Sequence, residues 1–512
     1  MLEPEGNTMT TRPNVLIIWT DQQHNEAIGA SGRSPVKTPH LDELASTGAM
    51  FEQAYCTQPV CSPSRASVLT GMYPHSHGIV HCNDVLDADV PTLAEILRDE
   101  GYVGGYVGKW HLGFELRPQR GFDDFWASTE DVYTAHDADV SEGNSKYHEW
   151  LVTKGYEPTD VGKFGLPVFS RDTVTKLPEE VSKPAFMAEQ TINFLDEHHD
   201  EPFVLSVNYL EPHFPFSSPY DGRYDPDDIE LPASWYAEMD DTVPQHYRLL
   251  REYFATRNPY VDTNDERGWK ELIARYLGMC SLIDTYTGKI LDHLTATGLA
   301  DNTIVVFTSD HGDMMGQLRL VCKSVQFERA VRVPLIIRAP GAEPRRITTP
   351  TSLVDITPTV LDLVGLPIPE HMEGKSLRPL IEKGDSAPDD ATVVIEWHDW
   401  DGIARVPQAG SPEPLRLWDL APNDQPESVG ARTIRRGRWK LSLYATGEAE
   451  LYDLETDPQE TRNVVDDDNE DVIDDLLARL RTWQRDTDDD FVISLPSSSG
   501  SAVSTQDGDE HR

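Results

Sequence analysis

Apolar runs rich in branched side chains recur along most of the chain, and segments with helical spacing of apolar residues separate them. The runs predict buried strands at Asn14–Trp19, Tyr102–Val107, Phe203–Tyr209 and Thr303–Thr308. Helical spacing is found at 38–48, 92–100, Phe186–His198 and Leu272–Thr295. Strands that alternate with helices predict a mostly parallel α/β sheet with right-handed connections.

Polar residues and glycines mark the ends of two of these helices. Thr38, before Pro39, and Thr92 stand where an N-cap is expected, because their hydroxyls can accept a free N–H of the first turn. Gly48 and Gly101 stand where the helices should end. These signals predict short helices that each follow or precede a strand.

The pattern changes at Gly384–Asp390, a polar segment that predicts a linker. Short strands joined by tight turns follow at Thr392–Glu396, Arg432–Arg435, Trp439–Tyr444 and Glu450–Tyr452, and then a helix at Asp471–Arg485. We therefore expect a flexible N-terminus at 1–11, a large α/β domain at 12–385 and a smaller C-terminal α+β subdomain with an antiparallel sheet at 386–492. Residues 493–512, rich in Ser, Gly and Asp, predict a disordered acidic tail.

Two long segments, 131–182 and 215–265, are polar, rich in proline and irregular. They are too long for simple connections between a strand and a helix. Loops of this kind often carry binding residues on a rigid scaffold. We expect these segments to form lids or walls around a substrate.

Charge restricts the partners of this chain. Its 88 acidic and 44 basic residues give a formal net charge of −44. This charge disfavours nucleic acid and anionic membranes, which both attract basic surfaces. It suits a salt-rich cytosol, where ions screen the repulsion between acidic side chains, so a halophilic source is a hypothesis. The polar start of the sequence and the absence of a long apolar run predict a cytoplasmic protein.

Cysteine usage points away from structural roles. The chain has five cysteines, an odd number, and none of them forms a C-x-x-C pair. A disulfide framework or a structural zinc site is therefore not expected.

The segment Cys61-Ser62-Pro63-Ser64-Arg65 is the strongest chemical signal, and 66–71 (ASVLTG) extends it. Proline at the start of a helix places Cys61 at a helix N-terminus, which favours bound anions.

Acidic residues follow two of the predicted strands. Asp21-Gln22 comes after the first strand, and Asp310-His311 comes after the strand Thr303–Thr308. Ligands of α/β folds bind beyond the carboxyl ends of strands. Carboxylate oxygens at two such ends predict a site for a hard divalent cation.

Basic residues follow the other two predicted strands and the second acidic motif. Lys109 and His111 lie in a Gly-flanked segment after Tyr102–Val107, and His213 lies between prolines after Phe203–Tyr209. Lys323 comes shortly after Asp310-His311. An imidazole can transfer a proton near neutral pH, and ammonium groups can stabilise an anion.

These motifs and their order resemble the sulfatase family of the alkaline phosphatase superfamily, over roughly residues 12–490. The resemblance implies a large, mostly parallel mixed sheet between layers of helices, and a sulfuric ester hydrolase similar to arylsulfatases. It also implies that Cys61 is oxidised to formylglycine (3-oxoalanine). The partner for that step would be a formylglycine-generating enzyme or an anaerobic sulfatase-maturating enzyme.

The resemblance also assigns roles to site residues. One divalent metal, calcium first and manganese or magnesium as alternatives, would be bound by Asp21, Gln22, Cys61, Asp310 and His311. Arg65 would steady the nucleophile, and Lys109 and His111 would contact it, with His111 accepting a proton. His213 would assist the leaving oxygen, and Lys323 would bind the sulfate.

Departures from the commonest family pattern keep two other functions open. Many sulfatases have Asp and Asn where this chain has Gln22 and His311. The pair found here resembles the choline-sulfatase and phosphonate monoester hydrolase branches, so a phosphonate monoester or phosphodiester hydrolase is an alternative. A second alternative is a non-catalytic anion-binding protein in which Cys61 stays a thiol. The substrate, a small-molecule or carbohydrate sulfate ester, is not set by any pattern in the sequence.

Overall fold

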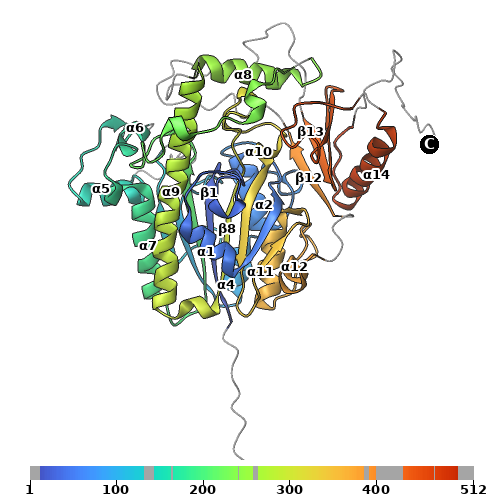
Figure 1. Ribbon diagram of the computed structural model, residues 1–512. Helices are drawn as coiled ribbons and strands as arrows, with labels where there is room; N and C mark the ends of the chain where they lie inside the picture. The colour runs from blue at the N-terminus through green and yellow to red at the C-terminus, as the bar shows by residue number, and fades with distance from the viewer. Residues whose placement is uncertain are drawn as a thin grey trace, which may run out of the picture.

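A large sheet and a smaller sheet organise the chain in the computed structural model (Figure 1). The structure describes residues 12–131, 143–162, 165–239, 241–257, 263, 265–385, 391–398, 430–465 and 468–493. The predicted flexible N-terminus (1–11), most of the predicted linker (386–390) and the predicted tail from residue 494 lie outside the described residues.

The large sheet is mixed, as predicted. Its strands follow the order β10-β2-β9-β8-β1-β7-β3-β4, with β11 also paired to β2. The run from β8 to β4 is parallel, whereas β9 is antiparallel to both of its neighbours. The strands are β1 Asn14–Asp21, β2 Ala49–Tyr55, β3 Val103–Gly108, β4 Phe125–Ser128, β7 Phe203–Pro212, β8 Thr303–Ser309, β9 Arg332–Arg338, β10 Arg345–Ile347 and β11 Thr351–Ser352.

Helices cover both faces of this sheet, which explains its apolar strands. In β1, Leu16 and Ile18 pack toward one helical layer, and Val15 and Ile17 pack toward the other. This alternation follows from the two-residue period of a strand. The first layer contains α1 Pro39–Thr47, α7 Lys183–Glu197 and α9 Glu266–Ala296. The second contains α2 Cys61–Thr70, α4 Leu93–Asp99, α11 Ile356–Val364 and α12 Arg378–Lys383.

The starts of α4 and α1 differ in how they are capped. Thr92 caps α4 in a capping box with Glu95, as the sequence predicts. Thr38 precedes α1 but makes no capping hydrogen bond, since its hydroxyl accepts the N–H of Gly29. Asp284 of α9 accepts the first N–H groups of α1 instead, so the prediction for Thr38 is wrong in its chemistry.

The smaller sheet is antiparallel and carries one long helix, as predicted. Its order is β12-β13-β14-β15. The elements are β12 Thr392–Trp397, β13 Ala431–Arg436, β14 Trp439–Tyr444, β15 Ala449–Asp453 and α14 Glu470–Asp486. The domain boundary at residues 385 and 386 stays a prediction, because the next described residue after 385 is 391.

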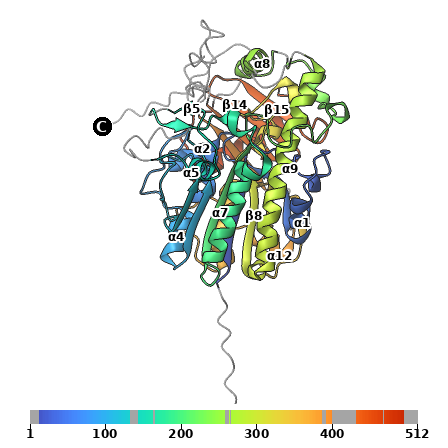
Figure 2. The same cartoon turned by 90° about the vertical axis from the view of Figure 1, so that its left-hand side faces the viewer.

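The two segments predicted as lids or walls contain short elements rather than bare loops. They include α5 Lys146–Thr153, β5 Asp160–Val161, β6 Pro167–Val168, α6 Arg171–Val174 and α8 Gln245–Arg257. Helix α8 lies at the top of the molecule in both views, beyond the end of the large sheet (Figures 1 and 2). None of the helices in the described residues is long and apolar enough to cross a bilayer.

Candidate active site

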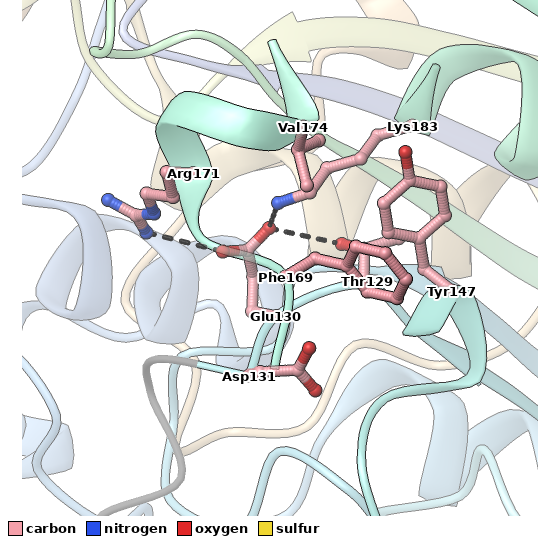
Figure 3. Close-up of a pocket in the computed structure, with 8 residues that line it drawn as sticks. All are labelled: Thr129, Glu130, Asp131, Tyr147, Phe169, Arg171, Val174 and Lys183. Atoms are coloured by element: carbon pink, nitrogen blue, oxygen red, sulfur yellow. Dashed lines mark hydrogen bonds and ion pairs between the residues drawn. The ribbon is translucent and has the colours of Figure 1, made fainter. Parts of the chain in front are cut away.

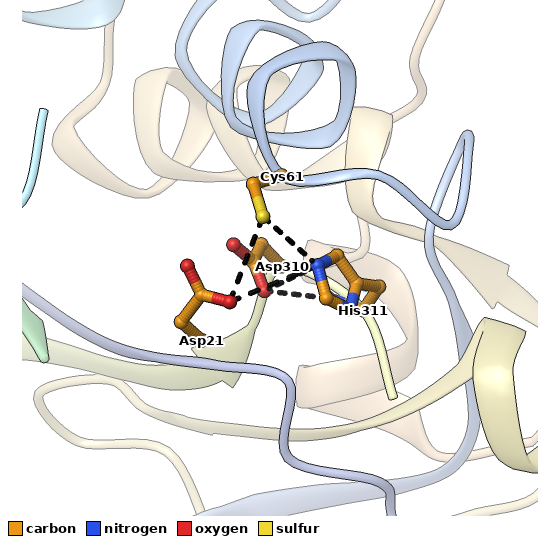
Figure 4. Close-up of side chains that lie close together, drawn as sticks. All are labelled: Asp21, Cys61, Asp310 and His311. Atoms are coloured by element: carbon orange, nitrogen blue, oxygen red, sulfur yellow. Dashed lines mark hydrogen bonds and ion pairs between the residues drawn. The ribbon is translucent and has the colours of Figure 1, made fainter. Parts of the chain in front are cut away.

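Four buried side chains from three separate parts of the chain meet beyond the carboxyl ends of β1 and β8 (Figure 4). Asp21 ends β1, Asp310 and His311 follow β8, and Cys61 is the first residue of α2. One ligand atom from each lies within 4.8 Å of the others. Because β1 and β8 are parallel neighbours, their ends deliver these side chains to one place.

Arg65 lies between the two carboxylates. It donates from Nη2 to Asp21 Oδ2 at 3.2 Å and from Nε to Asp310 Oδ2 at 2.9 Å. Burial, followed by the nearby charge of Asp21, raises the pKa of Asp310 to about 6. Burial and Cys61 would also raise the pKa of Asp21, but Lys109 and Lys323 outweigh them and hold it well below its usual range. Two carboxylates buried at one point need positive charge to ionise together.

The donor set fits a divalent cation. His311 Nδ1 lies 2.9 Å from the carbonyl oxygen of Gly312, so this nitrogen donates, and in the neutral ring that a metal ligand requires Nε2 carries the lone pair. That Nε2 atom lies 3.5 Å from Asp310 Oδ1 and 3.8 Å from Asp21 Oδ1. Carboxylate oxygens with one imidazole nitrogen suit a hard or intermediate cation.

Gln22, the remaining predicted metal ligand, is held in a left-handed backbone conformation at φ 74°. Its backbone N–H donates to Asp310 Oδ1 at 3.1 Å, and its side-chain Nε2 donates to Asp313 Oδ2 at 2.5 Å. Its Oε1 accepts from Lys323 Nζ at 2.8 Å. The amide therefore presents its oxygen to the site and its nitrogen away from it.

Two lysines bring positive charge to Cys61, whose Sγ stands where an oxidised residue would carry oxygen. Lys323 Nζ lies 3.0 Å from Sγ, and Lys109 Nζ lies 2.6 Å from Asp21 Oδ2. Burial would raise the pKa of the Cys61 thiol. A hydrogen bond with Cys82 and the charges of both lysines lower it well below its usual value. The position is thus built for a negatively charged atom.

Two histidines border the same site and are neutral without substrate. Burial, then Lys109, lowers the pKa of His111 to about 3. Burial, then Lys323, holds the pKa of His213 well below its usual value. His213 Nδ1 lies 2.7 Å from the carbonyl oxygen of Phe214 and donates to it, which makes Nε2 the basic atom. Either imidazole can take up a proton.

Sequence reasoning missed three residues that shape this site. Glu115 accepts the N–H groups of Trp110 and His111 at 2.8 and 2.9 Å, where His111 has φ 62°. Asp313 binds the side chain of Gln22, and Cys82 contacts the Cys61 thiol. The position of Asp313 directly after Asp310-His311-Gly312 was the one available signal.

A small polar cavity lies next to the end of β4 (Figure 3). There, the Glu130 carboxylate forms ion pairs with Lys183 of α7 and with Arg171 of α6. These pairs attach the segment predicted as a substrate wall to the sheet edge. Burial would raise the pKa of Glu130, but Lys183 and Arg171 lower it. The cavity is lined by Thr129, Glu130, Asp131, Tyr147, Phe169, Arg171, Val174 and Lys183.

Comparisons with known proteins agree with the motif order. The chain is 29% identical over 466 residues to the uncharacterized sulfatase YidJ of Escherichia coli, covering 89% of this chain and 84% of that one. It is 28% identical over 478 residues to a choline-sulfatase of Rhizobium meliloti, covering 90% and 83%. The structure of a phosphonate monoester hydrolase from Silicibacter pomeroyi superposes with a TM-score of 0.73 at 26% identity, covering 92% and 94%. The sequence profile named Sulfatase matches residues 13–366, and the chain belongs to the sulfatase family, within the alkaline phosphatase superfamily.

Proposed function

We propose that this chain hydrolyses sulfate monoesters, with residue 61 as nucleophile after oxidation of Cys61 to formylglycine. The observation that carries the proposal is the position of Cys61, within 4.8 Å of the acidic and imidazole ligand atoms and 3.0 Å from Lys323. Relatives named as choline-sulfatase, arylsulfatase and N-acetylglucosamine-6-O-sulfatase support the reaction class.

A divalent cation would be held by Asp21, Gln22, Asp310, His311 and residue 61. When bound, it would lower the pKa of the attacking hydroxyl and offset the charge of the sulfate. Calcium is the first choice for a site rich in oxygen ligands, and manganese or magnesium are alternatives.

The residues around the nucleophile stabilise negative charge. A hydrated formylglycine has two hydroxyls, one to attack sulfur and one whose deprotonation expels the sulfate. Arg65 keeps both acidic ligands in place from within α2. Lys109 and Lys323 supply positive charge to the sulfate oxygens as charge moves to them.

The two histidines divide the proton transfers. We assign His111 to accept the proton of the second hydroxyl, because its imidazole is uncharged and can bind a proton, and because contact with residue 61 raises its pKa against the effects of burial and Lys109. We assign His213 to the leaving oxygen. It must first bind a proton at Nε2, which the negative charge of a bound sulfate ester favours.

Mass spectrometry of the peptide that spans residue 61 tests the nucleophile. We expect the mass of formylglycine in active protein co-produced with a maturation enzyme, and no turnover of nitrophenyl sulfate by Cys61→Ala. Chelation should remove activity, and calcium or manganese should restore it. Active native protein with an unmodified thiol would refute the mechanism. Protein that binds sulfate but stays an inactive thiol even after co-production with a maturation enzyme would favour the non-catalytic alternative.

A phosphonate monoester or phosphodiester hydrolase is the second candidate. The similarity to two phosphonate monoester hydrolase structures, at 26% identity with TM-scores of 0.73 and 0.71, favours it, as does the Gln22 and His311 pair. Rates on nitrophenyl sulfate and on a nitrophenyl phosphate diester decide between them. A preference of several decades for the diester would reverse our assignment.

We also propose that the protein works in a salt-rich, reducing cytoplasm. Its net charge of −44 supports this, since salt screens the repulsion between acidic residues. All five cysteines lie in the described residues, and none of them forms a disulfide there. Unbridged cysteines are usual in a reducing compartment. Melting temperature should rise steeply with KCl concentration, and equal stability without salt would contradict the proposal.

A further inference from the structure

We propose that Asp313 is a positioning residue whose carboxylate sets the orientation of the Gln22 amide and the path of the loop that carries Lys323. The inference rests on the proposed function, because Gln22 and Lys323 act there on the metal and on the sulfate. Asp313 is fully buried, and the next helix, the 3-10 helix Gln317–Arg319, has Gly316 as its N-cap, so the side chain of Asp313 does not serve as a cap.

One oxygen of Asp313 controls Gln22. An amide side chain can present either its oxygen or its nitrogen to a given point, and its partners decide which. Asp313 Oδ2 accepts from Gln22 Nε2, so Oε1 must face Lys323 and the acidic ligands. The reversed amide would point an N–H donor at the cation.

The other oxygen of Asp313 controls the loop. Oδ1 accepts the backbone N–H of Met315 at 2.8 Å and that of Cys322 at 2.9 Å. Cys322 and Ser324, on either side of Lys323, both have left-handed backbones at φ 67° and 79°. Such backbones persist only where surrounding bonds hold them. Asp313 thereby fixes the point from which Lys323 reaches Cys61.

A carboxylate is the side chain that this position requires. It accepts on both oxygens, and here every partner is a donor: the side-chain amide of Gln22 and the N–H groups of Met315 and Cys322. Asparagine keeps the size but has one oxygen and one NH₂ group. If the oxygen faces the backbone N–H groups, the NH₂ group opposes Gln22 and turns its amide around.

This argument predicts both a loss and a rescue. Asp313→Asn should weaken the binding of calcium and manganese by about 10–100-fold, measured by titration calorimetry. Adding Gln22→Glu should restore affinity to within about threefold of the unaltered protein. The NH₂ group of the new asparagine can donate to one oxygen of Glu, whose other oxygen faces the cation.

Asp284→Asn is the matched control, because Asp284 is also a buried carboxylate that accepts two backbone N–H groups, those of His40 and Leu41. It should lower the melting temperature and leave metal affinity unchanged. Metal affinity of Asp313→Asn equal to that of the unaltered protein, or a loss that Gln22→Glu does not reverse, overturns the proposal. If the unaltered protein binds none of calcium, manganese and magnesium, the proposed function itself fails, and that result is distinguishable from a failure at Asp313 alone.

Discussion

The buried side chain of Arg65 contacts several parts of the candidate site. Beside its bonds to Asp21 and Asp310, it donates to the carbonyl oxygen of Lys109 at 3.0 Å and lies 5.5 Å from the ring centre of Trp19. Its side chain is 1% exposed. A buried guanidinium between two carboxylates offsets their repulsion before any metal binds, and it holds the ends of three strands together.

Arg65→Ala should therefore damage stability as well as activity. It removes the buried cation that Asp21 and Asp310 share and leaves only Lys109 paired with Asp21, so we expect the free energy of unfolding to fall by about 3–5 kcal/mol. Denaturant unfolding of metal-free protein measures this. Arg98→Ala is the control, because Arg98 pairs with Asp123 at 2.6 Å on the surface and should cost less than about 1 kcal/mol. Equal losses would contradict the structural role of Arg65.

The role of His213 can be separated from binding by the choice of leaving group. His213→Asn should lower kcat by about 10²–10⁴-fold on an alkyl sulfate, whose alkoxide needs a proton as it departs. The same variant should lose much less on nitrophenyl sulfate, whose phenolate leaves without help. A uniform loss on both substrates would assign His213 to substrate binding instead.

Strands differ in how well the sequence reveals them. The predicted strands correspond to β1, β3, β7 and β8, which lie side by side in the middle of the sheet. Burial on both faces makes such strands continuously apolar. The other five strands of this sheet, β2, β4, β9, β10 and β11, were not predicted, and two of them show why. β2 carries Glu52 and Gln53 at an irregularity in its pairing, and β9 contains Pro334, which reads as a turn signal.

Sequence reasoning identified those candidate site residues that stand at the end of a predictable strand. Asp21, Asp310 and Lys109 are of this kind. Glu115 and Asp313 are not, because their roles depend on backbone N–H groups and on an amide that only folding brings near. Residues 22 and 313 are 291 positions apart, and no local pattern records such a contact.

Two glycines with the same backbone conformation test how α4 is packed. Gly121 and Gly101 have φ 84° and 86°. A Cβ at Gly121 would lie 2.3 Å from the backbone carbonyl carbon of Ala94 in α4, whereas no atom of the described residues lies within 4 Å of one at Gly101. Gly101→Ala should lower the free energy of unfolding by about 1–2 kcal/mol through backbone strain alone. Gly121→Ala should lower the free energy of unfolding by more than about 4 kcal/mol, because a clash with α4 adds to the backbone strain. Equal losses of unfolding free energy for the two variants would show that α4 shifts to accommodate the added Cβ.

At the scale of the whole molecule, the small sheet contacts the segment that precedes Cys61, the proposed nucleophile. The backbone N–H of Glu396 in β12 donates to the carbonyl oxygen of Thr57 at 2.7 Å. Arg435 of β13 donates to the hydroxyl of Tyr55, at the end of β2, at 3.0 Å. Three residues, 58–60, separate Thr57 from the start of α2. We therefore expect movement of the small sheet to shift Cys61, the proposed nucleophile.

His75 also contributes to the contact between the two sheets, because it binds Glu396 of β12. Its charge makes this contact dependent on pH. Its Nδ1 lies 2.6 Å from Glu396 Oε1, and its Nε2 lies 2.9 Å from the carbonyl oxygen of Thr487, beyond α14. Both partners only accept, so both ring nitrogens must carry hydrogen and His75 must be positively charged. Burial would lower the pKa of His75, but the hydrogen bond and charge of Glu396 raise it to about 9.

The sign of the pH dependence follows from this raised pKa. A histidine with a higher pKa in the folded protein than in the unfolded chain contributes its full stability below the unfolded value, about 6.5, and loses it as pH rises through about 9. With allowance for the partial exposure of His75, we expect the free energy of unfolding to fall by about 1–2 kcal/mol between pH 6.5 and 9.5 from this residue. His75→Gln cannot change charge and should lack that part of the fall. Parallel curves of unfolding free energy against pH for the two proteins would show that the contact between the sheets does not depend on a charged His75.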